Sequence, residues 1–117
     1  IKLTYKDSSF LFAGDLYTNA EREIAAKYGE RLRSGVLKVP HHGAGTSSSK
    51  PFREAVGAEV AVMMSDAIEE LRIYRNYSKA GTRTLITSID GAVLVATTGD
   101  GEYTVLSQFD RVSDFLD

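Results

Sequence analysis

The sequence predicts an α/β fold, with a mixed sheet and flanking helices. Short apolar or alternating stretches, which are typical of strands, alternate along the chain with stretches of helical periodicity. Toward the C-terminus this alternation gives way to successive strands that are joined by turns rich in Gly and Asp. The resulting order is ββαβαβαβββ. Such an order favours one sheet layer that contains both parallel and antiparallel strands.

The composition is that of an ordinary folded protein. The chain has 117 residues, of which 43% are hydrophobic and 26% charged, and it contains no repeat or linker, so we expect a single domain over 1–117. The net charge of −2 gives no overall sign of binding to nucleic acid or to a membrane surface. The absence of cysteine excludes disulfides, thiolate zinc sites and a thiol nucleophile. No apolar run approaches the roughly 18 residues of a membrane span, so we expect a soluble domain without membrane contact of its own.

The first elements are a hairpin and a helix. Residues 1–5 alternate apolar and polar side chains, residues 6–8 have turn chemistry, and the apolar run 9–13 predicts a buried strand. A helix is expected to begin at the stretch Thr18-Asn19-Ala20-Glu21, because it matches a capping box. Gly29 is its expected end. Because the chain opens on Ile rather than Met, within a strand pattern, we expect it to be a piece of a longer protein.

The middle of the chain continues the strand and helix pattern. We expect a strand over 36–39, a loop over 40–47, a helix from Ser48 or Ser49 to Gly57, a buried strand over 58–64 and a longer helix from Ser65 or Asp66 to Gly81. The hydroxyl groups at 46–49 are best explained as helix caps, because the spacing of a phosphate-binding P-loop is not met.

The last third predicts three strands and a tail. The strands are expected over 82–87, 92–98 and 102–107, with turns over 88–91 and 99–101. The tail, 108–117, is expected to form a short amphipathic helix that packs back on the sheet.

The candidate functional residues are Asp15, His41 and His42, which follow predicted strands. Side chains at the ends of parallel strands enter the crevice above a sheet. All three are therefore candidate metal ligands, and the two histidines are also candidate catalytic residues. Adjacent residues in an extended segment point to opposite sides, so one histidine is expected to bind a metal and the other to face a substrate, in either order. The alternative is a polar turn with one exposed and one hydrogen-bonded histidine.

The stretch SFLFAGDLYTNAEREI, followed after a short gap by LKVPHHGAGTSSSKPFREAV, resembles the C-terminal half of metallo-β-lactamase superfamily domains. Within that superfamily it is most similar to the ComEC family of competence-associated DNA-uptake channel proteins, over about residues 1–65. The resemblance implies half of an αββα sandwich and a metal-dependent hydrolase directed at phosphodiesters or nucleic acid. It also implies that Asp15 bridges two zinc or manganese ions, that His41 or His42 completes the site, and that the domain is extracytoplasmic.

The chain departs from the family pattern in three places. It has no histidine before His41, so the His-x-His-x-Asp-His signature of the N-terminal half is absent. Ala44 replaces the usual serine, and no Tyr-Gly-His-Pro-like segment follows the strand over 58–64. A two-metal site needs more ligands than this chain offers. We therefore expect two ions only in a complete domain, and weak or no metal retention by this chain.

Two functions follow. The chain is either part of a hydrolase, completed by the N-terminal half of the same domain or by a second copy in a homodimer, or a non-catalytic accessory or interaction domain of a DNA-uptake membrane protein. Half of a sandwich would expose one sheet face, expected to carry Leu11, Val62 and Val95, and an exposed face of that size predicts a partner.

Overall fold

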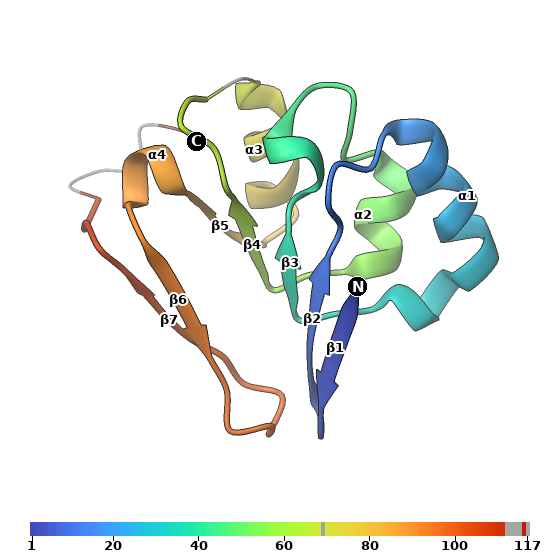
Figure 1. Cartoon of the computed structure of the whole chain (residues 1–117), viewed down its shortest axis with the longest axis horizontal. Helices are drawn as coiled ribbons and strands as arrows, with labels where there is room; N and C mark the ends of the chain where they lie inside the picture. Colours follow the sequence, from blue (N-terminus) through green and yellow to red (C-terminus); the bar gives the residue numbers. More distant parts are fainter. Residues whose placement is uncertain (69, 112–115, 117) are drawn as a thin grey trace.

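A five-stranded sheet forms the body of the molecule in the computed structural model (Figure 1). The structure describes residues 1–68, 70–111 and 116. The strands follow the order β1 (Lys2–Tyr5), β2 (Ser8–Phe12), β3 (Val36–Lys38), β4 (Val60–Met63) and β5 (Arg83–Ile86). β1 pairs antiparallel with β2, whereas β2 to β5 are parallel to one another. The predicted mixed sheet is therefore confirmed.

Helices cover one face of this sheet and form the main core with it (Figure 1). They are α1 (Thr18–Tyr28), α2 (Lys50–Val56) and α3 (Leu71–Ser78), with the short helices η1 (Gly29–Leu32) and η2 (Pro40–Gly43) in the connections. Alternation along β2 turns Leu11 toward the helices, where it is buried, and turns Phe10 and Phe12 to the opposite face. The expectation that Leu11 lies on an open face is therefore wrong.

A separate antiparallel hairpin lies on the face that the helices leave free. It consists of β6 (Val93–Ala96) and β7 (Thr104–Ser107), joined by the predicted turn over 99–101. Its inner side chains pack against the sheet, and the Phe10 and Tyr103 rings meet edge to face at 5.7 Å. Ser9 donates its backbone N–H to the Tyr103 hydroxyl at 2.8 Å. The hairpin thus begins a second layer on this face.

One predicted capping box and one predicted helix start are wrong because side chains bond elsewhere in the fold, although α1 begins at Thr18 and ends before Gly29 as expected. No side chain caps α1: the Thr18 hydroxyl donates to the carbonyl of Thr46, and Glu21 accepts hydrogen bonds from a distant loop. The helix expected from Ser65 or Asp66 begins only at Leu71, since Ser65 bonds Ala67 and Thr87 instead.

The C-terminal third also differs from the prediction. The strand expected over 82–87 joins the main sheet as β5 and does not pair with the hairpin. The turn expected over 88–91 is a one-turn helix, α4 (Thr87–Asp90). Of the tail expected to be helical, residues 112–115 and 117 lie outside the described residues. Leu116 is buried in the main core.

Candidate metal centre

The predicted ligands follow two strands that are parallel neighbours in the sheet. Phe12 of β2 is paired with Lys38 of β3, so the chain leaves both strands at the same edge. Asp15 follows the end of β2 and the histidines follow the end of β3. The two exits are joined directly, because His41 donates its backbone N–H to the carbonyl of Gly14 at 3.0 Å.

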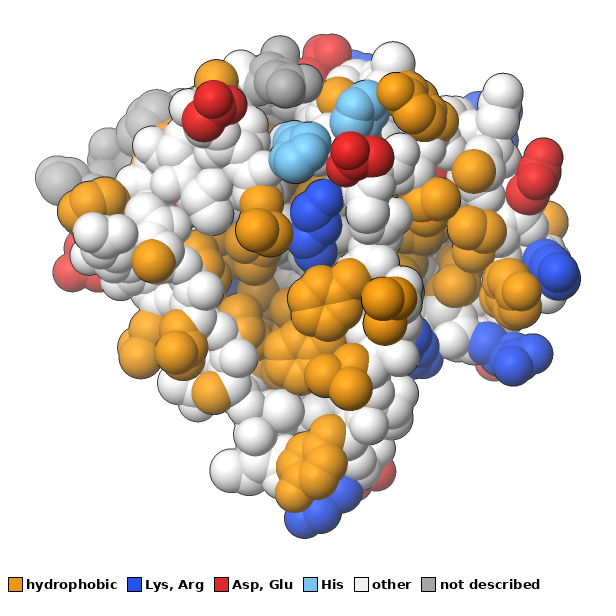
Figure 2. Space-filling model, in the orientation of Figure 1, with side chains coloured by type: hydrophobic (Ala, Val, Ile, Leu, Met, Phe, Trp, Pro, Cys, Tyr) orange, Lys and Arg blue, Asp and Glu red, His pale blue; other side chains and the backbone are white. Residues whose placement is uncertain are grey.

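The backbone at the histidines is left-handed, and the expected extended geometry is wrong. His41 has φ 48° and ψ 45°, His42 has φ 57° and ψ 13°, and Gly43 continues at φ 87°. A residue other than glycine in this region costs on the order of 1 kcal/mol or more. Hydrogen bonds within the loop hold the conformation: Ala44 donates to the carbonyl of His41 at 2.9 Å, and the Ser47 hydroxyl bonds the carbonyl of Ala44 at 2.8 Å. As a result both rings lie side by side on one face, with centroids 6.3 Å apart (Figure 2).

His42 and Asp15 face each other across a short gap. The Nδ1 of His42 lies 2.7 Å from the carbonyl oxygen of Met64. A carbonyl only accepts, so Nδ1 carries a proton and the neutral ring has its lone pair on Nε2. That Nε2 lies 3.5 Å from Oδ1 of Asp15. The pair therefore offers two converging electron-pair donors when the ring is neutral, and an ion pair when the ring is charged.

The two donors have the spacing of neighbouring ligands in a tetrahedral zinc site. Bonds of about 2.0–2.2 Å at the tetrahedral angle place the two ligand atoms about 3.4 Å apart. The carbonyl of Met64 fixes the ring in the way that partners of metal-binding histidines usually do. Within 1–68, 70–111 and 116, however, no group of three or more His, Cys, Asp or Glu gathers. These residues thus offer two ligands and not a complete coordination sphere.

His41 lies beside this pair in a different environment. Its Nδ1 is 3.2 Å from the Thr46 hydroxyl, and its ring meets the Tyr17 ring at 4.7 Å between centroids. Of the two histidines, only His42 comes within 4.0 Å of a carboxylate oxygen in the described part of the chain, that of Asp15. The structure thus distinguishes His42, which faces Asp15, from His41, which does not, whereas the sequence leaves open which of the two faces a metal.

Sequence reasoning missed two charged residues around the centre. Lys38 Nζ lies 3.8 Å from Asp15 Oδ1 and donates to the carbonyl of Gly14 at 3.2 Å. Glu21 is fully buried and accepts the backbone N–H groups of Ser48 and Ser49, at the end of the loop that carries the two histidines. Lys38 stands within the motif that carries the resemblance, but only the pleat of β3 shows which way it points. The sequence shows Glu21 only as part of an apparent capping box, which does not reveal its bonds to the loop.

An apolar trough adjoins the centre. A cavity of about 220 Å³ lies between the sheet and the hairpin, lined mainly by Phe10, Phe12, Lys38, Val62, Met64, Val93 and Val95. Figure 2 shows a band of hydrophobic side chains on the same face as the two histidines. Phe12 and Met64 are each about half exposed, at 49% and 53%. Val62 and Val95, expected to lie on an open face, are half-buried here.

Comparison with known proteins relates the chain to competence-related proteins. No family model matches it. Over 74% of its length it is 35% identical to a segment of "Competence protein ComA" from Neisseria gonorrhoeae, and over 68% it is 32% identical to a segment of "Uncharacterized protein YcaI" from Escherichia coli (strain K12). The matched segments make up 13% and 10% of those relatives, so the chain spans about a tenth of their length. The predicted relationship is thereby confirmed at the level of competence-related proteins.

The same relatives do not extend the finding to the metallo-β-lactamase superfamily, which is named by neither of them. Among the described helices, none is both long and apolar enough to cross a membrane.

Proposed function

We propose that this chain is part of a metal-dependent hydrolase linked to DNA uptake, in which Asp15 Oδ1 and His42 Nε2 hold a zinc or manganese ion. The observation that carries the proposal is their 3.5 Å separation, with the His42 tautomer set by the carbonyl of Met64. Both donor types suit zinc in a chain without cysteine. The similarity to a competence protein supports the link with DNA uptake.

The chemistry assigned to each residue follows from its contacts. A divalent ion held there would supply Lewis-acid chemistry at a phosphorus or carbonyl centre. Met64 keeps the His42 ring oriented through its carbonyl oxygen. His41 has its Nδ1 beside Thr46, so its Nε2 is the atom that can hold or deliver a proton to a leaving oxygen.

The described residues provide no third ligand at this pair, so the remaining ligands must come from elsewhere. We propose that the chain forms the second half of a metallo-β-lactamase αββα sandwich, completed by an N-terminal half or by a second copy. The apolar trough supports this, because the hairpin covers the sheet only in part and leaves Phe12 and Met64 about half exposed. A second sheet laid beside the hairpin would cover both side chains and bring further ligands to the same edge.

The alternative is a non-catalytic accessory domain of a DNA-uptake membrane protein. The contacts of Asp15 favour it: both His42 and Lys38 lie within 4.0 Å of its Oδ1. With a charged imidazole, these three residues would form a surface ion cluster and need no metal.

A zinc titration of the 117-residue chain, monitored by NMR of the histidine rings, distinguishes the hydrolase from the accessory domain. For the hydrolase we expect the Nδ1–H tautomer of neutral His42 and a zinc-dependent shift at its Nε2, with a much smaller response at His41. Binding should be weak and lost on dialysis, since two ligands do not fill a tetrahedral site.

Asp15→Asn should weaken the zinc response about tenfold or more, because it removes the charged ligand. Asp7→Asn is the matched control, an exposed aspartate in the turn at the opposite end of β2, and it should leave the response unchanged. A response centred on His41, or one that survives Asp15→Asn, would contradict the assigned ligands. The absence of a zinc-dependent shift at either ring would favour the accessory domain.

A further inference from the structure

Lys38 adjoins the candidate metal centre and has no role in the hydrolase proposed above. It is the last residue of β3 and points away from the helices, toward the trough lined by Phe10 and Val62. Its side chain is only 15% exposed, and Nζ donates to the carbonyl of Gly14 at 3.2 Å. The ammonium is thus held in a fixed place beside the centre, unlike a lysine that extends into solvent.

Charge balance at Asp15 links this ammonium to the metal. Oδ1 of Asp15 has His42 Nε2 at 3.5 Å and Lys38 Nζ at 3.8 Å, so one carboxylate oxygen serves both groups. In the part of the chain that the structure describes, Asp15 supplies the only carboxylate within 4.0 Å of this Nζ. A divalent ion on Asp15 would take over its charge. One ion, one carboxylate and one ammonium then sum to two positive charges, and an ammonium that has lost its counter-charge favours an incoming anion.

We infer that Lys38 is an anion-binding residue of this centre, whose ammonium holds a non-bridging oxygen of a phosphodiester and so favours anionic phosphodiesters over neutral esters. The inference rests on the proposed function, since the ion creates the excess charge. A purely structural role, in which Lys38 only neutralises Asp15 and packs its stem in the trough, makes no such distinction between ligands.

The test uses a matched pair of ligands on the 117-residue chain: dimethyl phosphate, which is an anion, and trimethyl phosphate, which is neutral. Binding is followed by NMR with and without zinc. With zinc we expect the wild-type chain to bind dimethyl phosphate about tenfold or more tightly than trimethyl phosphate, as a charge-assisted hydrogen bond requires.

Variants of Lys38 isolate the charge. Lys38→Met keeps the length of the stem and Lys38→Gln keeps a donor for Gly14; both should lose about tenfold in affinity for dimethyl phosphate and nothing for trimethyl phosphate. Lys38→Arg keeps the charge and should stay close to wild type. Lys79→Met is the charge-matched control, an exposed lysine just past the end of α3. Zinc affinity should be equal or higher in Lys38→Met, because a like charge is removed from beside the ion.

The outcomes distinguish this inference from the proposed function. If Lys38→Met binds dimethyl phosphate as wild type does, or if the wild-type chain prefers neither ligand, the inference is overturned. If zinc shifts the His42 ring but the Lys38 variants bind dimethyl phosphate as wild type does, the metal proposal stands and the inference fails. If zinc shifts neither ring, the metal proposal fails and the excess charge that the inference requires is absent. A zinc response retained in Lys38→Met shows that the variant is folded at the centre.

Discussion

Replacing Glu21 with glutamine is expected to destabilise the chain by about 3 kcal/mol. Glu21 is fully buried, and its two carboxylate oxygens accept backbone N–H groups of Ser48 at 2.6 Å and Ser49 at 2.7 Å. Glutamine has one carbonyl oxygen and one NH₂ group, so one backbone donor would face another donor. The variant would therefore lose a charge-assisted hydrogen bond and leave a buried N–H unpaired.

The surroundings of Glu21 give the loop little freedom to adapt. Ser48 has a left-handed backbone with φ 62°, and its hydroxyl oxygen accepts the Tyr77 hydroxyl at 3.0 Å. Burial raises the pKa of Tyr77, so this hydroxyl stays a neutral donor. Since the same loop carries His41 and His42, its loosening should also broaden the NMR signals of both rings.

Urea unfolding measures the effect of Glu21→Gln on the free energy of unfolding. Glu23→Gln is the matched control, because Glu23 lies on the same helix and is exposed; it should change stability by less than about 0.5 kcal/mol. A Glu21→Gln chain as stable as this control would show that the carboxylate does not anchor the loop.

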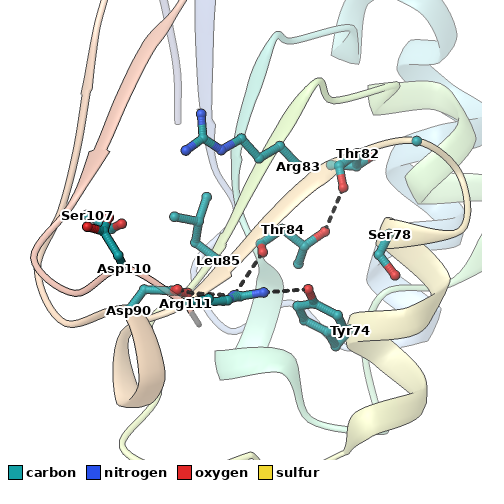
Figure 3. Close-up of a pocket in the computed structure, with 11 residues that line it drawn as sticks. Tyr74, Ser78, Thr82, Arg83, Thr84, Leu85, Asp90, Ser107, Asp110 and Arg111 are labelled. Atoms are coloured by element: carbon teal, nitrogen blue, oxygen red, sulfur yellow. Dashed lines mark hydrogen bonds and ion pairs between the residues drawn. The ribbon is translucent and has the colours of Figure 1, made fainter. Parts of the chain in front are cut away.

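Breaking the ion pair between Asp90 and Arg111 is expected to cost about 3–5 kcal/mol. Asp90 is buried; its Oδ1 accepts Nε of Arg111 at 2.7 Å, and its Oδ2 accepts Nη2 at 2.6 Å together with the backbone N–H of Ile86 at 2.7 Å. Arg111 also donates to the Tyr74 hydroxyl at 2.7 Å and to the carbonyl of Thr84 at 3.1 Å (Figure 3). The guanidinium thereby fastens the segment after β7 to the edge strand β5.

The pair responds as a unit because each partner compensates the buried charge of the other. The hydrogen bonds that Arg111 donates to Asp90 raise the pKa of the guanidinium, which keeps it charged. Arg111→Met leaves a buried carboxylate, and Asp90→Asn leaves a guanidinium with a weaker acceptor. We expect the double variant to lose less than the sum of the two single losses.

Thermal and urea unfolding of the two single variants and the double variant form the test. Asp110→Asn is the control, since Asp110 is an exposed neighbour that lines a cavity of about 440 Å³ together with Asp90 and Arg111. Additive losses, or single losses no larger than that of Asp110→Asn, would show that the pair is not coupled and adds little stability.

The resemblance and the ligand types were predictable from short stretches of sequence. The strands ending before Asp15 and His41 are read from apolar runs followed by Gly or Pro, and the matching competence protein supports the relationship that these stretches indicated. The start of α1 was predictable, but the partners of its capping side chains were not. Glu21 satisfies a local capping pattern equally well, but burial against the loop at 48–49 gives it stronger partners.

The sequence by itself determined the mixed α/β layer, the candidate residues Asp15, His41 and His42, and the shortage of metal ligands, because apolar periodicity and residue counts are local properties. The tertiary structure alone decided that His42 faces Asp15, that Lys38 stands beside them, and that Leu11 lies under the helices. These facts depend on strand register and on a left-handed backbone at the histidines. The register is fixed by pairing between distant segments, and the loop is held both by its own hydrogen bonds and by those to Gly14 and Met64, so no local pattern encodes either feature in full.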